Sequence, residues 1–449
     1  MGGGGRRRSP STKPMRCRDE KQVPKCFRGV KCPYPQAQTV HAAHGAINYS
    51  LVGPEGGEVV VCLHGLNGSR VLFQDTAEQL ARHGGFRVLG YDLYGHGLSN
   101  APFVDLCPCR GVGRCGECVC CGAPRGRYDM DFFVDQTDDL LSLLGFGEVA
   151  VNLVGFSLGG AIAVAFAQRY PSRVLRLVAM SPAGFLPKVP MSYYLLKAVW
   201  CCLIPLAPHV LCTYWYKRER FARSVRGEGQ VDDEVIESLW SRFVWQLYVK
   251  RGVASATLAV CHRIPWFTLK PLFQDAGRNP RPVLLIWGEK DGLNPQKTVA
   301  KEVESCFSNV QLMVVPGAGH IAICDRPRQV IFSILSFLKL PLETRMGSIE
   351  LAVPPPAAMA SAPRRSASGR QSLPPQGGGP AASSVVPSAA ARKAASAAQM
   401  PVPMVLGLKE DVTATDELED LEPEGSLPDL RGQGYKVIPV DCGPPKQSL

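Results

Sequence analysis

Two kinds of hydrophobic pattern alternate through the middle of the chain. Short apolar runs that end in glycine or polar residues predict strands at residues 58–63, 86–91, 149–155, 174–180, 283–287 and 310–315. Apolar residues at helical spacing predict helices between them, at residues 72–82, 132–144, 158–169, 296–306 and 328–338. Nearly continuous apolar strands are typical of a parallel sheet covered on both faces. We therefore predict an α/β fold: an open, mostly parallel sheet with flanking helices and right-handed crossovers.

Two stretches interrupt this alternation. Residues 101–127 form a cysteine-rich insertion, and residues 184–280 separate the last two strands from the others. We predict that the second stretch is a helical cap. Within it, residues 193–216 are apolar over a length that could span a bilayer. Pro205 and Pro208 would break such a helix, so an amphipathic cap helix is the favoured interpretation.

The two ends of the chain differ from its middle in composition. The chain has 449 residues and a net charge of +11, but residues 1–35 alone carry 10 Lys and Arg against two acidic residues. We predict that they form a disordered basic arm. Residues 341–449 contain one aromatic residue and are predicted to be a disordered tail rich in Pro, Ala and Ser, with an acidic segment at residues 410–429. The catalytic domain is therefore predicted at residues 36–340. Because the basic charge lies in an arm, no nucleic-acid partner is expected.

The N-terminal sequence bears on the expected cellular location. No apolar segment of the kind found in signal peptides follows the basic start. Cytoplasmic location is therefore expected, with thiols reduced, and peripheral membrane contact through the cap or the basic arm remains open.

The pattern Gly155-Phe156-Ser157-Leu158-Gly159 is the strongest chemical signal in the sequence. It follows an apolar strand and opens an alanine-rich helix. A sharp strand–turn–helix corner of this kind exposes a serine hydroxyl, and glycines two residues to either side avoid clashes. Ser157 is therefore the predicted nucleophile.

Serine needs a base and an orienting carboxylate to become reactive. Of the three histidines after Ser157, only His320 lies outside the predicted cap, in a loop after the last strand. Glu289 and Asp291 both follow the preceding strand, and we favour Asp291 because it lies closer to the loop tip. Both loops leave the carboxyl ends of strands, where an open α/β sheet collects its site.

An oxyanion would need two backbone N–H donors. We predict that Leu158, directly after the nucleophile, supplies one. The loop after the strand at residues 58–63 would supply the other, from Leu66. His64, in the same loop, is expected to shape it and not to transfer protons.

Taken together, these motifs resemble the α/β-hydrolase superfamily, and within it the monoacylglycerol-lipase-like and related lipid-esterase branches. The resemblance covers about residues 40–340 and is carried by the segments 155–160, 287–291 and 317–320 together with His64-Gly65 and Asp92–Ser99. It implies the α/β-hydrolase fold, with the helical cap inserted before the last two strands as a lid over an acyl pocket. It also implies that Asp92 and His96 belong to a structural loop. Ser157 argues against the epoxide hydrolase and haloalkane dehalogenase branches, which are known for aspartate at this position.

The expected function is therefore a serine hydrolase that cleaves carboxylic esters, with lipid or acyl esters as small-molecule substrates and no cofactor or metal. Thioester or carbon–carbon bond hydrolysis on the same triad, and a catalytically idle scaffold, are the alternatives. The six cysteines between Cys107 and Cys121 have spacings that leave a zinc knuckle open. A flexible insertion or acylated cysteines are favoured there, because four ligands from so short a glycine-rich loop would need unusual geometry.

Overall fold

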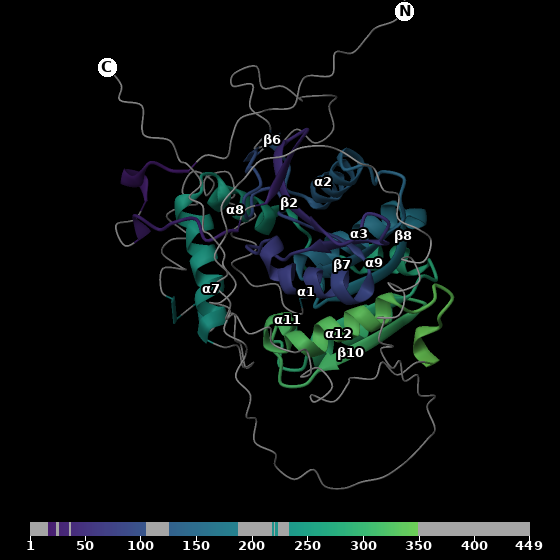
Figure 1. Cartoon of the computed structure of the whole chain (residues 1–449). Coiled ribbons are helices and arrows are strands. Elements are labelled where there is room, and N and C mark those ends of the chain that lie inside the picture. The colour runs from purple at the N-terminus through teal and green to yellow at the C-terminus, as the bar shows by residue number, and fades with distance from the viewer. Residues whose placement is uncertain are drawn as a thin grey trace, which may run out of the picture.

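An eight-stranded sheet forms the centre of the computed structural model, which describes residues 17–23, 27–35, 37–104, 125–186, 218–219, 221–222 and 233–348. Figure 1 shows the sheet among its helices, and its strand order is β1-β2-β4-β3-β7-β8-β9-β10. The β1–β2 and β2–β4 pairs are antiparallel and all others are parallel. The strands are β1 Gln38–Ala42, β2 Gly45–Val52, β3 Val59–Leu63, β4 Arg87–Tyr91, β7 Val151–Phe156, β8 Val174–Met180, β9 Val283–Gly288 and β10 Val310–Val315. The short strands β5 Phe103–Val104 and β6 Arg125–Gly126 pair with each other apart from the sheet.

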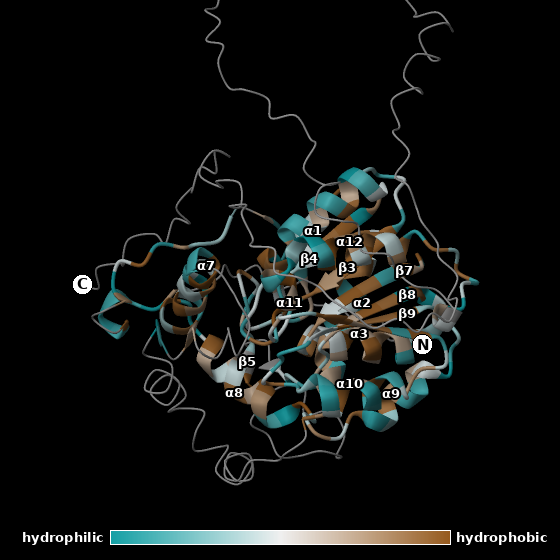
Figure 2. Ribbon diagram, turned by 90° about the horizontal axis from the view of Figure 1, so that it is seen from below, coloured by the Kyte–Doolittle hydropathy of each residue, from teal (hydrophilic) through white to brown (hydrophobic). Residues whose placement is uncertain are grey.

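Helices cover both faces of the sheet (Figure 2). One face packs against α1 Gln74–Gln79 and α12 Pro327–Leu338, and the other against α2 Met130–Leu143, α3 Leu158–Arg169, α9 Lys270–Gly277 and α10 Gln296–Glu304. Successive residues of a strand point to opposite faces. In β3, for example, Val60 and Cys62 enter one hydrophobic cluster while Val61 and Leu63 enter the other. The apolar strands that the sequence pattern identified are therefore buried on both faces, and the predicted α/β architecture is confirmed.

The six predicted strands agree with the observed ones within one or two residues at each end. The antiparallel pair β1–β2, which lies at one edge of the sheet, was not predicted. Its side chains are partly exposed at β1, and its sequence mixes Gln, Thr, His, Asn and Ser with apolar residues. The helix predicted at residues 72–82 is three shorter pieces: η3 Arg70–Phe73, α1, and the π-helical turn η4 Leu80–Gly84.

The prediction of a disordered arm at residues 1–35 is wrong for residues 17–23 and 27–35, the part of it that the structure describes. The turn η1 Glu20–Gln22 and the residues around it pack on the cap, where Val23, Phe27 and Tyr34 are buried. Phe27 stacks on Tyr248 with ring centroids 4.4 Å apart. The three apolar side chains are four and seven residues apart, as on one face of a helix, but Pro24 and Pro33 interrupt the segment, so the sequence did not predict an ordered element there.

The cap is helical where the structure describes it. It comprises α7 Asp233–Val244, the π-helical turn η6 Trp245–Val249 and α8 Val253–Arg263 between β8 and β9. In Figure 1, α7 stands to one side of the sheet and its helices. The last helix of the predicted cap, α9, packs instead against α3 as part of the sheet's covering layer, because Phe273 is buried in that core.

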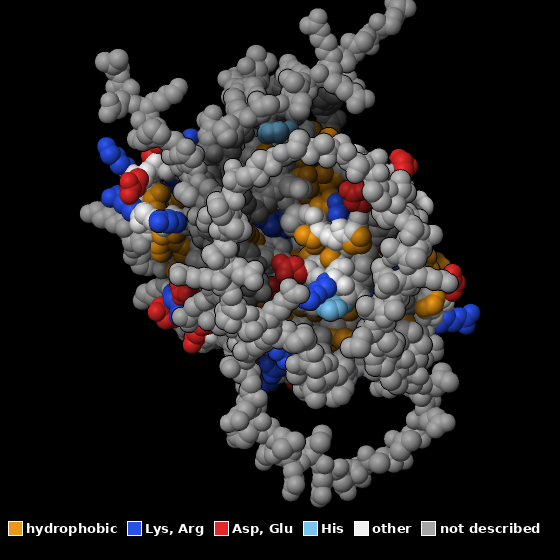
Figure 3. Space-filling view, viewed as in Figure 1, with side chains coloured by type: hydrophobic (Ala, Val, Ile, Leu, Met, Phe, Trp, Pro, Cys, Tyr) orange, Lys and Arg blue, Asp and Glu red, His pale blue; other side chains and the backbone are white. Residues whose placement is uncertain are grey.

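The apolar run at residues 193–216 lies outside the described residues. No helix within the described ranges is both long enough and apolar enough to cross a membrane. On the face seen in Figure 3, basic and acidic side chains are interspersed.

Candidate active site

The corner between β7 and α3 places Ser157 in an unusual backbone conformation. Ser157 has φ 52° and ψ −116°, and a positive φ is strained for a residue with a side chain. The surroundings fix this conformation: the Ser157 N–H donates to the carbonyl of Met180, 2.9 Å away, and the Ser157 carbonyl accepts from Ala161 and Ala183. The candidate nucleophile therefore lies on a strained corner at the end of β7, the geometry in which such a motif exposes its serine hydroxyl.

The two glycines of the motif allow three backbone segments to meet. A Cβ on Gly155 would lie 2.4 Å from the carbonyl oxygen of Gly159, and a Cβ on Gly159 would lie 2.1 Å from that of Leu63. A Cβ on Gly65 would lie 3.2 Å from Cβ of Ser157. Only glycine permits the loop after β3 to approach the candidate nucleophile this closely.

The structure brings Ser157, His320 and Asp291 together, although they come from three separate loops. His320 Nδ1 lies 2.8 Å from Asp291 Oδ2, and His320 Nε2 lies 3.3 Å from Ser157 Oγ. A carboxylate only accepts, so the ring proton belongs on Nδ1, which leaves Nε2 free to accept the serine proton. The Asp291 side chain is buried, and its other oxygen accepts the N–H groups of Leu293 and Asn294 at 3.0 and 2.8 Å. These bonds orient the carboxylate toward the imidazole.

Two further carboxylates hold the loop that carries His320. Glu289, the rejected candidate for the acid, accepts the N–H of Gly317 at 2.8 Å. Asp325 accepts the N–H of Gly319 at 2.6 Å, and burial raises the pKa of its carboxyl above the ordinary value. Sequence reasoning missed Asp325. Its place five residues after His320, just before a helix-opening Pro327, was the available signal.

The two predicted oxyanion donors belong to segments that meet at Ser157: Leu158 follows it directly, and Leu66 follows Gly65, which lies against it. Leu158 begins α3, so its N–H is one of the helix's first donors and has no intrahelical partner. Leu66 lies in a turn closed by the N–H of Gly68, which donates to Gly65 at 3.0 Å. Among the described residues, neither the Leu66 nor the Leu158 N–H donates a hydrogen bond. Their role as oxyanion donors therefore stays a prediction.

His64 and His96 are buried, and the hydrogen bonds described for their rings go to backbone groups and not to the triad. His64 Nε2 accepts the N–H of Leu93 at 3.0 Å, so its Nδ1 donates to the Gly65 carbonyl at 2.8 Å. Burial lowers the pKa of His64 and lowers the pKa of His96 to about 3, so both rings are neutral. His64 thus shapes its loop, as the sequence indicated.

Asp92 organises the loop after β4. Its carboxylate accepts the N–H of Arg70 at 2.7 Å and that of Leu98 at 2.8 Å. Gly97 lies against it, since a Cβ there would be 2.2 Å from the carboxylate carbon. Asp92 therefore has the structural role that the family resemblance implied.

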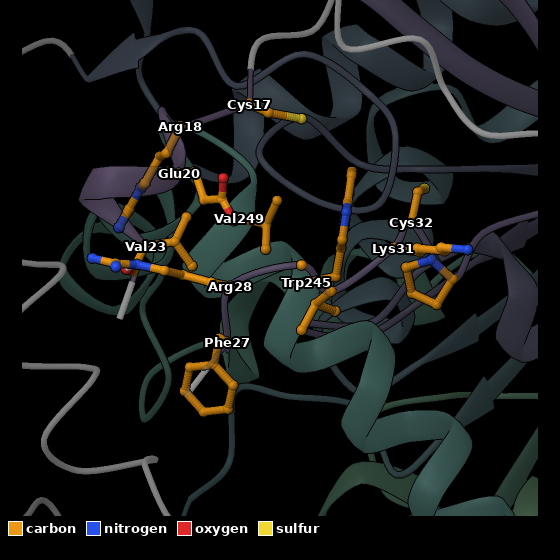
Figure 4. A pocket seen from close by; sticks show the side chains of 13 residues that line it. Cys17, Arg18, Glu20, Val23, Phe27, Arg28, Lys31, Cys32, Trp245 and Val249 are labelled. Carbon is orange, nitrogen blue, oxygen red and sulfur yellow. Dashed lines mark hydrogen bonds between the residues drawn. The ribbon is translucent and has the colours of Figure 1, made fainter. Parts of the chain in front are cut away.

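A separate pocket of about 670 Å³ lies between the N-terminal segment and the cap (Figure 4). Val23, Phe27, Trp245 and Val249 line it together with Arg28, and no triad residue does. Within the described part of the chain, no group of three or more His, Cys, Asp or Glu is arranged to hold a metal ion. The cysteines between Cys107 and Cys121 lie outside the described residues.

Known proteins resemble about two thirds of this chain. The family model of the alpha/beta hydrolase fold matches residues 58–200. The sn-1-specific diacylglycerol lipase ABHD11 of Mus musculus is 26% identical over 300 residues, which cover 65% of this chain and 85% of the relative. Epoxide hydrolase 3 of Xenopus tropicalis is 23% identical over 319 residues, covering 67% and 79%. An esterase structure from Exiguobacterium antarcticum superimposes with a TM-score of 0.52 at 18% identity, covering 68% of this chain and all of that one.

This chain is therefore an α/β-hydrolase-fold protein. The family match, the sheet topology and the superposition on the esterase structure agree on that fold. The family match and the curated relatives support a hydrolytic function.

Proposed function

We propose that the protein is a serine hydrolase that cleaves carboxylic esters through an acyl-enzyme. The observation that carries the proposal is the chain of contacts from Asp291 through His320 to Ser157, at 2.8 and 3.3 Å. The strained corner between β7 and α3, where Ser157 lies, also supports the proposal. The relative from Xenopus tropicalis is named an epoxide hydrolase, a branch known for an aspartate nucleophile, but this chain has Ser157 at that position.

The proposed mechanism has two halves. The Ser157 oxygen attacks the ester carbonyl while His320 Nε2 takes the hydroxyl proton, and the N–H groups of Leu66 and Leu158 bind the oxyanion. The tetrahedral intermediate collapses, the bond to the alcohol breaks, and His320 returns the proton to the leaving oxygen. Water then attacks the acyl-enzyme with His320 as base, which releases the acid and restores the Ser157 hydroxyl. Asp291 stabilises the imidazolium in both halves.

Acyl or lipid esters are the proposed substrate class. The proposal is motivated by the apolar composition of the cap, whose described part holds a hydrophobic cluster that includes Ile236, Phe243 and Leu247. One relative is named a diacylglycerol lipase. An acyl chain that enters apolar surroundings gains roughly 0.8 kcal/mol for each buried methylene.

A panel of p-nitrophenyl esters with the full-length protein tests the substrate class. We expect kcat/KM for octanoyl and longer esters to exceed that for acetyl by about tenfold or more. Equal kcat/KM across the panel would remove the lipid preference and leave a general esterase. No hydrolysis of any ester, above a Ser157→Ala control, would count against the ester proposal itself.

A further inference from the structure

The cap reaches the candidate active site through one buried amide. Gln246, in η6, is only 3% exposed. Its Oε1 accepts the N–H of Gly97 at 2.5 Å, and its Nε2 donates to the carbonyl of Asn67 at 3.1 Å. A single side chain of the cap thus joins the loop after β4 to the loop after β3. Removing it would leave buried backbone groups unpaired.

The cap also holds Asn67 through a second contact. The φ of Asn67 is 57°, in the left-handed region that asparagine enters more readily than most residues with a side chain. A second cap residue, Thr257 in α8, donates its hydroxyl to Asn67 Oδ1 at 2.8 Å. Two cap residues therefore hold Asn67: Gln246 binds its backbone carbonyl and Thr257 binds its side chain. Asn67 directly follows Leu66, whose N–H is the proposed oxyanion donor.

Lys250 fixes the position of Gln246 itself. Lys250 lies one turn after Gln246 and is buried, and its Nζ donates to the carbonyls of His96 at 3.0 Å, Gly97 at 2.8 Å and Ser99. The loop after β4 therefore binds the cap at both Gln246 and Lys250. The bond from the Gly97 N–H anchors one end of the Gln246 amide. The bond from its other end, Nε2 to the Asn67 carbonyl, therefore sets where the Asn67 peptide lies.

We propose that Gln246 is a positioning residue that holds the Leu66 N–H toward the oxygen that develops negative charge at Ser157. The inference rests on the proposed function, because that charge develops only if Ser157 attacks a carbonyl. A donor must lie within hydrogen-bond reach of the oxyanion, and displacement of a catalytic group by about 1 Å can cost up to about a hundredfold in rate. The cap would then be part of the catalytic machinery and not only a cover over the substrate.

Gln246→Ala in the full-length chain tests the proposal. Two rates are measured: the second-order rate of labelling by a fluorophosphonate probe, and kcat with a p-nitrophenyl ester. We expect both to fall about tenfold, while KM stays within about twofold, because the lost contact orients a group that binds the transition state. Thr257→Val keeps the side-chain shape but removes the bond to Asn67, and we expect a smaller loss of about threefold in the same two rates.

Gln136→Ala is the matched control. Gln136 lies in α2 and is 1% exposed; its Oε1 accepts the N–H of Tyr94 at 2.9 Å and its Nε2 donates to the Asp92 carbonyl at 3.1 Å. It bridges the loop after β4 as Gln246 does, but neither bond reaches Asn67. We expect Gln136→Ala to lower Tm comparably and to leave the labelling rate within about twofold of wild type.

The outcomes separate the inference from the proposed function. Slower labelling for Gln246→Ala and Thr257→Val, with Gln136→Ala near wild type, supports the positioning role. A wild-type rate for Gln246→Ala, or equal slowing of all three variants in proportion to Tm, overturns it. If Gln246→Ala does not fold, the labelling rate of Thr257→Val at unchanged Tm decides in the same way. A wild-type protein that resists the probe contradicts the proposed function itself, and the positioning role with it.

Discussion

At the scale of single residues, the two carboxylates after β9 have different surroundings. Asp291 is 3% exposed, and three hydrogen bonds tie it to His320 and to two backbone N–H groups. Glu289 is exposed and accepts one backbone N–H, from Gly317. Burial and a histidine partner suit Asp291 to orient an imidazole, whereas Glu289 stabilises the loop in which His320 lies.

We predict that Asp291→Asn lowers kcat by about 10³–10⁴-fold, because an amide favours the wrong ring tautomer of His320. Glu289→Gln keeps an oxygen that can accept the Gly317 N–H, so we expect less than about a threefold change. Initial rates with one p-nitrophenyl ester check both variants. A loss on Glu289→Gln as large as that on Asp291→Asn would show that the two roles are assigned wrongly.

The candidate triad was predictable from the sequence because each member follows a strongly apolar strand. Ser157, Asp291 and His320 lie just after β7, β9 and β10, and parallel strands bring such loops to one edge of the sheet. The partners that hold the site were not predictable. Asp325 and Gln246 act through hydrogen bonds whose other members lie in a different turn or far away in the chain, and no periodic pattern marks them.

At the scale of elements, the buried parallel strands were the easiest to predict and the edge hairpin the hardest. Strands β3, β7 and β9 are buried at every position, which makes their sequences continuously apolar. Strand β1 lies at the edge of the sheet and has only β2 as a neighbour. The sequence of this hairpin therefore carries polar residues and resembles that of a loop.

Two neutral histidines from different loops lie beside one another: His64 follows β3, His96 follows β4, and their ring centroids are 5.4 Å apart. Burial lowers the pKa of His96 from 6.5 to about 3. The unfolded chain therefore binds a proton that the folded chain excludes, so stability is complete above about pH 6.5 and falls as the pH drops toward 3.

We predict that the free energy of unfolding, measured in urea, falls by a few kcal/mol, about 4 or less from His96 alone, between pH 6.5 and 3. In His96→Asn this pH dependence should be weaker, because no buried imidazole remains at that position to be charged. His83 is exposed and serves as the control: His83→Asn should keep the wild-type slope. Identical slopes in His96→Asn and wild type would contradict the assignment.

At the scale of the whole molecule, the N-terminal segment belongs to the folded body. Cys17 pairs with Lys250 as an isolated antiparallel bridge, and the Arg18 N–H donates to the Val249 carbonyl at 2.8 Å. Tyr34 packs edge-on against Trp245 with ring centroids 5.5 Å apart. The segment therefore contacts the cap turn that carries Gln246, and a charge-rich composition concealed these few apolar anchors.

Deletion of residues 1–35 should lower the free energy of unfolding by about 3 kcal/mol or more, since three side chains that the fold buries would be lost. Deletion of residues 1–16 removes none of the contacts described above and should leave stability within about 0.5 kcal/mol. Urea unfolding of both truncated proteins beside the full chain gives the comparison. Equal stability of all three would mean that the segment does not contribute to the fold.

The central claim is that Ser157 is activated by His320, and covalent labelling tests it most directly. The full-length protein is treated with a fluorophosphonate probe, beside Ser157→Ala and His320→Ala, and the modified peptide is identified by mass spectrometry. We predict that the wild type is labelled on Ser157, that Ser157→Ala is not labelled, and that His320→Ala is labelled at least about a thousandfold more slowly. Undiminished labelling of Ser157→Ala, or no labelling of the wild type, would contradict the account.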